Sequence, residues 1–483
     1  MCSPFVSLRY ETKTSNMRTP AKSTRILSEN KILRLLRSSE RYRLRLARRE
    51  QKIKFLEQEN ARLRGLSEPQ PVCGHTYPAQ MMAIAVFIVV CGGSLRLAAK
   101  TAGFYADLMA WSYGVPSHVT IRNWMMSCGL SVLNGGSKLS GQYTLIVDES
   151  VQIGKEKLLL LLGLPNRLHQ SQCAALRHED VEVLGMSVQT SWTGQKIAAF
   201  IDLRVRQLGI KLTGMLSDRG TNLLKACKIR QMAHLSDCSH WMMNGVKAIF
   251  KNDAELSTLC AEVGKLRQRL SMTDYAHLLP PTLRDKDRFC RIFQLTDWMD
   301  RVEIHVEQHE QQARQYLSFL SGTEALQLRL REVRHLVQIS GQILRRCGLS
   351  KTSYELWKQR TQAYLHEQGG GSQAARAFVL HMQTYFDLHR KWYEDGQRYI
   401  CCSEVIESYF GKYKNKGGMK VISADVLCMS LYGQKLNVRQ VKQMMENSSV
   451  EKVRKWKKQH IAMNRYGILH QLRQEQKVRT PDG

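Results

Sequence analysis

The length, composition and charge of the chain exclude several classes of protein. The chain has 483 residues, 43% hydrophobic and 24% charged, which is enough for about three domains with real cores. Its 72 Lys and Arg against 42 Asp and Glu give a formal net charge of +30, which argues against an ordinary metabolic enzyme and indicates a polyanionic partner, most often nucleic acid. The longest strongly apolar run, Met81 to Cys91, spans about eleven residues whereas a membrane helix needs about 20, so we expect a buried helix and no membrane partner.

The positive charge is concentrated at the two ends of the chain. Residues 1–64 hold 17 Lys and Arg against 6 Asp and Glu, and residues 412–483 hold 16 against 5. Each end therefore carries +11, and the 347 residues between them supply the remaining +8. Basic arms of this kind bind phosphates of DNA or RNA with release of counterions, so we expect salt-dependent binding. A solubilising surface is the alternative explanation of the same asymmetry.

Residues 1–66 read as a basic arm followed by a coiled coil. Residues 1–24 are rich in Ser and Thr and are expected to be disordered. A seven-residue spacing begins at residue 32 and is clearest at Ile53, Leu56, Asn60 and Leu63. A buried Asn in such a seam fixes the register and favours two strands, so the pattern predicts self-association. Arg49 interrupts the seam, and a single basic amphipathic helix lying on protein or DNA is the alternative.

Residues 78–133 read as a helical DNA-binding domain. A helix of small residues follows Ser94, a turn occupies residues 114–117, and a second helix opens at Ser117. This order is typical of a helix-turn-helix, whose second helix enters the major groove. The side chains that would then face DNA are Thr120, Arg122 and Asn123. Because the turn is longer than usual, an ordinary helical pair is the alternative.

Residues 141–250 change from helical to strand periodicity. Four runs that predict strands lie at residues 143–150, 157–163, 181–188 and 196–203. Two further runs, at residues 211–218 and 233–237, alternate with helix. Strands that first meander and then alternate with helices predict a mixed α/β sheet.

Residues 251–400 lack strand signals and carry apolar residues at helical spacing, so they predict an all-α segment. Pro280-Pro281 and the three glycines at 369–371 interrupt it. Residues 401–420 are expected to hold one amphipathic helix, at 404–414. Residues 421–483 are then predicted to be a basic helical tail.

Three carboxylates stand where a metal site would form. Asp148 and Asp218 each end a predicted strand, and sites in open α/β sheets form at the carboxyl ends of strands. Glu407 lies on the later helix. Three converging carboxylates hold two divalent ions about 4 Å apart, an arrangement that suits phosphodiester chemistry. For either aspartate alone, capping of the helix that follows is the alternative.

The sequence around these acids resembles a known family. The matching segments, in order, are Ile-Val-Asp148-Glu-Ser, Leu-Ser-Asp218-Arg-Gly-Thr-Asn222, Asp237-Cys-Ser-His240 and Ser403-Glu-Val-Ile-Glu407-Ser-Tyr-Phe-Gly-Lys-Tyr-Lys414. They resemble the DDE transposases, which have an RNase H-like catalytic domain. Asp218 and Glu407 are 189 residues apart, and the long helical segment between them is similar to the all-helical insertion of hAT-like transposases. Among these relatives, a bacterial insertion-sequence enzyme of related build fits best. The resemblance implies an α+β multidomain fold: an RNase H-like mixed α/β core interrupted by an all-α insertion, with an N-terminal coiled coil and helix-turn-helix.

The resemblance also implies roles for individual residues. Asp148, Asp218 and Glu407 would bind Mg²⁺ or Mn²⁺, and His240 would orient or contact the scissile phosphate. Glu407 is preferred to Glu404 because the family often places a basic residue seven positions after its glutamate, where Lys414 lies.

Two lysines and one tryptophan complete the candidate DNA contacts. Lys412 and Lys414 lie at the end of the predicted catalytic helix. Related enzymes stack an aromatic side chain of the insertion on a flipped base, and Trp298 is the candidate here. Packing of Trp298 in a helix core is the alternative.

The function implied is that of a DNA transposase. It would bind the terminal repeats of its own element, cleave phosphodiesters and join the freed 3′-hydroxyl to target DNA. Its partners would be double-stranded DNA and further copies of itself, as a homo-oligomer, and in a bacterium it would be cytoplasmic and nucleoid-associated. A non-catalytic DNA-binding regulator derived from a transposase and a structure-specific RNase H-like nuclease are the alternatives.

Overall fold

A computed structural model describes residues 29–135, 141–151, 156–166, 175–283, 288–309, 311–393, 396–415, 422–463 and 467–473. The chain divides into two units, residues 1–69 and residues 70–483. None of the helices in the described ranges is long and apolar enough to cross a membrane. The Ser/Thr-rich residues 1–24 lie outside the described residues.

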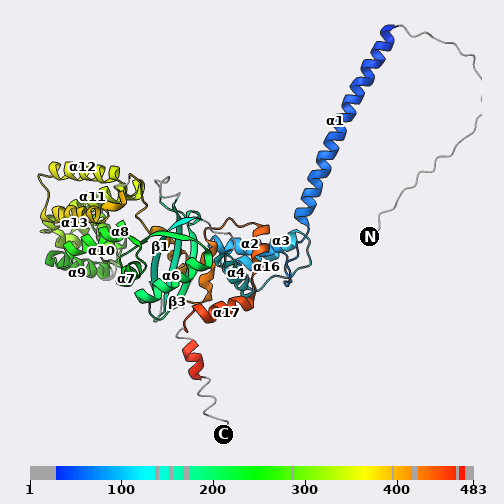
Figure 1. The fold of residues 1–483 in the computed structure, drawn as a ribbon. Helices are drawn as coiled ribbons and strands as arrows, with labels where there is room; N and C mark the ends of the chain where they lie inside the picture. Colours follow the sequence, from blue (N-terminus) through cyan, green and yellow to red (C-terminus); the bar gives the residue numbers. More distant parts are fainter. Residues whose placement is uncertain are drawn as a thin grey trace, which may run out of the picture. The chain divides into compact units, whose positions relative to one another are not determined.

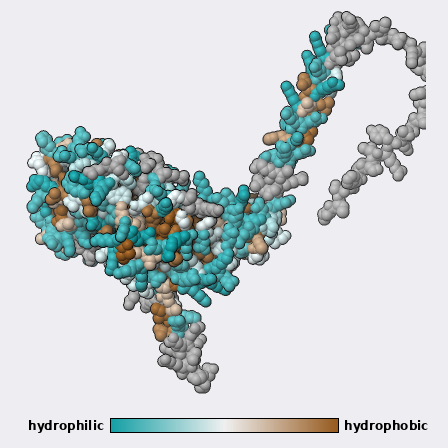
Figure 2. All heavy atoms as spheres, in the orientation of Figure 1, coloured by the Kyte–Doolittle hydropathy of each residue, from teal (hydrophilic) through white to brown (hydrophobic). Residues whose placement is uncertain are grey.

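The first unit contains one uninterrupted helix, α1 (Glu29–Ser67), as Figure 1 shows. Those of its side chains that the structure describes are exposed, except for the half-buried Glu59, and Figure 2 shows apolar patches among mostly hydrophilic ones along the helix. Ile53 and Leu56 of the predicted seam are 55% and 47% exposed, and Asn60 is exposed as well. The helix is therefore confirmed, whereas its pairing with a second copy stays a prediction.

The second unit begins with three helices, α2 (Ala79–Val90), α3 (Leu95–Leu108) and α4 (His118–Leu133). The hydroxyl of Ser94 accepts a hydrogen bond from the Leu97 amide, and that of Ser117 from the Thr120 amide. Both serines are therefore N-caps, as the sequence predicts, because a cap oxygen satisfies an amide that the first turn leaves unpaired. The apolar run from residue 81 forms the buried α2.

The C-terminal segments pack against these helices. They are the 3₁₀ segment η4 (Ala424–Leu431), α16 (Val438–Asn447) and α17 (Val450–His460). The helix α4 is buried along most of its length, between η4, α16 and α17. Past α17, the amide of Ala462 donates to the carbonyl of Val188 on a sheet edge. Residues 424–462 are thus part of the same packed body rather than an appended tail.

A five-stranded mixed sheet forms the centre of the second unit. Its strands are β1 (Gln142–Val151), β2 (Lys157–Pro165), β3 (Glu182–Gln189), β4 (Lys211–Ser217) and β5 (Ala233–Ser236). The order is β3-β2-β1-β4-β5; the pairs β3/β2 and β2/β1 are antiparallel, and the pairs β1/β4 and β4/β5 are parallel. The predicted mixed sheet is confirmed, and the chain as a whole is α+β.

One predicted strand is wrong. Residues 196–203 belong to the helix α6 (Gly194–Leu208) and not to a fourth strand of the meander. Thr193 caps its first turn, and Gly209 ends it in the left-handed conformation that glycine adopts at low cost. With α7 (Thr221–Ile229), α6 buries one face of the sheet.

The segment after β5, which includes the predicted all-α residues 251–400, is helical in the residues that the structure describes. It consists of α8 (Cys238–Phe250), α9 (Ala254–Leu270), α10 (Arg288–His309), α11 (Glu324–Cys347), α12 (Lys351–Glu367), α13 (Gln373–Leu388) and α14 (Arg390–Tyr393), with 3₁₀ segments η2 (Ala276–Leu278) and η3 (Gln311–Leu320). A further 3₁₀ segment, η1 (His178–Asp180), precedes β3, and α15 (Glu404–Lys414) has the predicted bounds. Leu328, expected in an apolar stripe, is 51% exposed.

Candidate active site

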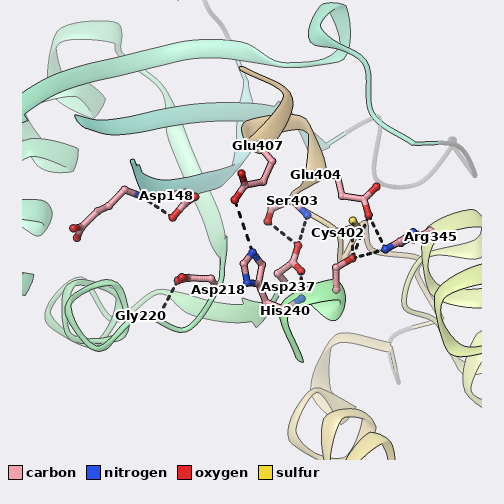
Figure 3. Close-up of polar contacts among 12 residues, drawn as sticks. Asp148, Asp218, Gly220, Asp237, His240, Arg345, Cys402, Ser403, Glu404 and Glu407 are labelled. Atoms are coloured by element: carbon pink, nitrogen blue, oxygen red, sulfur yellow. Dashed lines mark hydrogen bonds and ion pairs between the residues drawn. The ribbon is translucent and has the colours of Figure 1, made fainter. Parts of the chain in front are cut away.

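The fold brings three distant acids to one side of the sheet. Asp148 lies within β1 and not at its end, but two residues beyond Ile146, the last residue of β1 that pairs with β4. Asp218 follows β4 directly, and Glu407 lies in the first turn of α15, which packs against β1. Figure 3 shows the three carboxylates around one space, with His240 between them.

The carboxylates interact electrostatically. The pKa of Asp148 is raised from its ordinary 3.8 to about 8, chiefly by burial and in addition by the neighbouring charges of Asp218 and Glu407. The hydrogen bond from the Glu149 amide opposes this rise. A like charge disfavours ionisation only at short range, so the three acids form one electrostatic cluster.

Each aspartate is fixed by one backbone amide. Oδ1 of Asp148 accepts a hydrogen bond from the Glu149 amide at 2.7 Å, and Oδ1 of Asp218 accepts one from the Gly220 amide at 2.8 Å. Within the described ranges the second oxygen of either aspartate accepts no hydrogen bond. These oxygens are therefore available to a cation or a substrate group.

Glu149, the neighbour of Asp148, has a different partner. Its carboxylate lies 3.6 Å from the ammonium of Lys157. Successive side chains of a strand point to opposite faces, so Asp148 and Glu149 do not share a site.

His240 is positioned by Asp237. The Asp237 carboxylate is 2% exposed and accepts a hydrogen bond from the His240 amide at 2.7 Å, which caps α8. Its other oxygen accepts from the Ser403 hydroxyl at 2.7 Å and from the Ser403 amide. One carboxylate thus fixes both the start of α8 and the start of α15. As a result, Nε2 of His240 lies 4.0 Å from the Glu407 carboxylate (Figure 3).

The two glutamates of α15 have different environments. Glu404 pairs with Arg345 of α11 at 2.9 Å and accepts a hydrogen bond from the Ser239 hydroxyl at 3.3 Å. Glu407 instead faces His240 and contributes to the raised pKa of Asp148. The geometry therefore favours Glu407, as the sequence does, and gives Glu404 the task of tying α15 to the insertion.

The predicted recognition helix is mostly internal. Arg122 donates from both its Nε and its terminal nitrogen to Asp425 of η4, at 2.6 and 3.0 Å, so its guanidinium holds two segments together instead of standing free for a base. The Thr120 hydroxyl shares a hydrogen bond with Ser117. Asn123 is half-buried. The prediction that these three side chains read DNA finds no support in their placement.

The remaining predicted contacts are placed differently from one another. Lys414 is exposed at the end of α15, while the Lys412 ammonium lies 4.5 Å from the ring centre of Tyr432. Trp298 is 6% exposed, and its indole N–H donates to the Leu278 carbonyl. Trp298 therefore belongs to the core of the insertion, which was the alternative, and it is not available for stacking on a base.

The structure adds residues that sequence reasoning missed. His178 of η1 hydrogen-bonds the Ser408 hydroxyl of α15 at 3.0 Å, and Arg345 pairs with Glu404. No local pattern links either residue to α15, because His178 and Ser408 are 230 positions apart and Arg345 and Glu404 are 59 apart. Arg219 stands inside a quoted motif, directly after Asp218, and its neighbours could have drawn attention to it.

The sequence matches no protein-family model and no curated protein. The site therefore has to be judged on its own chemistry. Three carboxylates and one imidazole form a donor set that suits hard divalent cations. In the described part of the chain, however, no group of three His, Cys, Asp or Glu side chains is drawn together closely enough to hold a metal ion.

Proposed function

We propose that the protein is a DNA transposase that binds the ends of its element and carries out metal-dependent phosphodiester cleavage and strand transfer. The observation that carries this proposal is the convergence of Asp148, Asp218 and Glu407, which come from two adjacent parallel strands and a helix 189 residues later. Such clustering of like charges raises the free energy of the folded chain, so it calls for a functional reason.

The proposed chemistry assigns a task to each side chain. Asp148, Asp218 and Glu407 would hold Mg²⁺ or Mn²⁺, which when bound activates the attacking oxygen and stabilises the leaving oxygen. Asp148 would release its proton to solvent on binding, because its raised pKa keeps it protonated at neutral pH without a cation. His240, next to Glu407, would contact the scissile phosphate.

The finer features of the fold belong to the same proposal. The antiparallel meander followed by parallel strands, with the second aspartate directly after β4, supports an RNase H-like core. The long insertion between β5 and α15 supports the hAT-like resemblance. We propose in addition that α1 pairs with a second copy as a coiled coil, and that the α3–α4 pair derives from a helix-turn-helix.

DNA binding is supported by exposed basic side chains at both ends of the chain. On α17 only Val453 and Trp456 are buried, and all five lysines and arginines are exposed: Lys452, Arg454, Lys455, Lys457 and Lys458. Because this helix is anchored on α4 and β3, its charge belongs to a fixed surface and not to a loose tail. Phosphate contacts from such a surface give affinity without sequence specificity.

One observation favours a second candidate. The spacing of the carboxylates in the described residues is wider than a bound metal ion requires. A non-catalytic DNA-binding regulator derived from a transposase would retain the fold and the basic surfaces with such a site. A structure-specific nuclease on the same core would cleave but would not transfer strands.

Cleavage of DNA that carries the element ends tests the proposal. Wild-type protein with Mg²⁺ or Mn²⁺ should nick the end and then join the 3′-hydroxyl to a target duplex. Asp218→Asn, or EDTA, should abolish both products while DNA binding persists. Cleavage without joining would indicate the nuclease, and specific binding with neither product would indicate the regulator.

A further inference from the structure

An arginine beside the carboxylates has hydrogen-bond donors that the protein does not use. Arg219 lies between Asp218 and Gly220 and is half-buried. Within the described ranges no carboxylate or carbonyl accepts a hydrogen bond from its guanidinium. Its one direct contact there is with the face of Trp241, whose ring centre lies 5.0 Å from the guanidinium carbon. A guanidinium has five donors, so leaving all of them unused next to a half-buried site is unusual.

Other half-buried arginines of the same chain are satisfied internally. Arg204 donates to the carbonyls of Leu184 and Leu133, at 2.7 and 2.6 Å. Arg267 donates to the carbonyl of Pro280 at 2.6 Å. Both of these arginines serve packing, and Arg219 does not follow their pattern.

The support beneath Arg219 is rigid. The indole N–H of Trp241 donates to the His381 carbonyl at 3.1 Å, and the His381 ring bonds the Trp241 carbonyl at 2.9 Å. The two rings stack at 5.1 Å with 27° between their planes. Gly245 permits this approach of α8 and α13, because a Cβ there would lie 2.4 Å from the His381 ring. The Trp241 ring that the Arg219 guanidinium contacts is thus fixed by its hydrogen bond to and stacking on His381.

The backbone at Arg219 is also unusual. Its φ of 70° lies in the left-handed region that glycine and asparagine prefer. An arginine there is strained, because its Cβ lies too close to the carbonyl oxygen that follows. Strain of this kind is concentrated at functional sites, where the surrounding structure maintains it.

We propose that Arg219 binds a backbone phosphate of the DNA strand next to the cleaved bond. The planar fork of a guanidinium matches two phosphate oxygens, and stacking on Trp241 leaves that edge free. Burial and the charge of Arg219 together lower the pKa of the neighbouring His234 to about 4. His234 is therefore uncharged at neutral pH, and Arg219 carries the positive charge beside it. The inference rests on the proposed function, because it names a contact to that substrate.

The experiment uses end-containing duplexes in which one phosphate at a time is replaced by a neutral methylphosphonate. Wild-type protein should cleave the duplex at least about tenfold more slowly when the methylphosphonate replaces the phosphate that Arg219 contacts. Arg219→Gly should cut the unmodified duplex about 10–100 times more slowly and should show no further loss with that one methylphosphonate. Arg219→Lys, which keeps the charge but not the fork, should fall between the two.

Two controls separate this contact from damage to the fold. Arg219→Gly should melt at the same temperature as wild type or higher, since glycine adopts a φ of 70° without strain. Arg206→Ala, an exposed arginine of α6, should leave the methylphosphonate pattern unchanged.

The outcomes distinguish the inference from the proposed function. If Arg219→Gly cuts at the wild-type rate and retains the sensitivity to every methylphosphonate, the inference is wrong while transposition stands. If wild type cuts nothing, the proposed function fails, and affinity for the same duplexes without divalent ions decides the inference. A positional loss of affinity that disappears in Arg219→Gly supports it, and identical affinities overturn it.

Discussion

Replacing Asp148 by Asn should stabilise the metal-free protein, and the gain should grow with pH. In the folded chain the pKa of Asp148 is about 8, against an ordinary 3.8. Below about pH 4 the carboxyl is protonated in both the folded and the unfolded state, so it does not affect stability. As the pH rises towards 8 the unfolded state ionises while the folded state does not, and folding stability is lost. Asn has the same shape, still accepts the Glu149 amide and does not titrate.

The loss of folding stability follows from the difference between the pKa of Asp148 in the folded and the unfolded chain. Each pH unit between the two pKa values costs about 1.36 kcal/mol, so at pH 7 the upper limit is about 4 kcal/mol. Asp148 is partly exposed, and solvent screening reduces this to about 2–3 kcal/mol. For a body of this size that corresponds to a rise in Tm of several degrees.

The assay is thermal unfolding in EDTA at pH 5 and pH 8, with wild type and Asp148→Asn. The difference in Tm should be small at pH 5 and several degrees at pH 8. Mg²⁺ should then raise the Tm of wild type more than that of the variant, since a bound ion stabilises only the folded state. Asp107→Asn, on an exposed position of α3, is the matched control and should leave Tm unchanged at both pH values. A Tm difference that is equal at pH 5 and pH 8 would refute the carboxylate cluster.

Three further outcomes are expected. Ile53→Asp combined with Leu56→Asp should lower the oligomer mass in sedimentation, and an unchanged mass would leave α1 as a single basic helix. Glu407→Gln should slow cleavage by about 10²-fold or more, whereas Glu404→Gln should retain most of the activity. The reverse result would show that Glu404 is the metal ligand. Affinity for DNA should fall steeply between 50 and 200 mM salt, and a flat dependence would exclude phosphate contacts as its main source.

Apolar runs and amphipathic periodicity were sufficient to predict some elements. The apolar run 157–163 became β2, and the amphipathic pattern of residues 404–414 became α15 with the same bounds. Residues 196–203 failed because their apolar positions, Ile197, Ala198, Phe200 and Ile201, fit one face of a helix as well as a buried strand. The deciding signals were the cap at Thr193 and the stop at Gly209, which the strand reading left unused.

The features that the sequence did not predict depend on contacts between distant parts of the chain. Arg122 and Asp425 are 303 residues apart, and Asp237 and Ser403 are 166 apart, so no local pattern pairs them. The candidate acids were found because each lies in or beside an element with a recognisable local pattern: an apolar run for Asp148 and Asp218, and an amphipathic helix for Glu407. The helix-turn-helix reading was weaker, since it depended on α4 being exposed, and burial of α4 is decided by residues more than 290 positions later.

The packing of α4 on η4 leads to a prediction about the whole second unit. Gly129 of α4 lies so close to η4 that a Cβ there would stand 2.1 Å from the Leu427 carbonyl oxygen and 2.6 Å from its carbon. These are backbone atoms, which cannot rotate away as a side chain can. Gly129→Ala must therefore push the two segments apart and open the contacts around them.

The expected cost of Gly129→Ala is about 2–4 kcal/mol, well above the gain of about 1 kcal/mol that alanine brings to a helix interior. Gly264→Ala in α9 is the matched control, because nothing lies within 4 Å of its Cβ position, and it should raise Tm slightly. Thermal unfolding of both variants measures the difference. If Gly129→Ala also raises Tm, α4 and η4 do not pack this closely, and residues 424–462 would again be a tail that the N-terminal helices do not need. If Tm falls as expected, residues 424–462 are part of the body that holds α15 in place, and changes in α4 should reach Glu407 through η4 and α15.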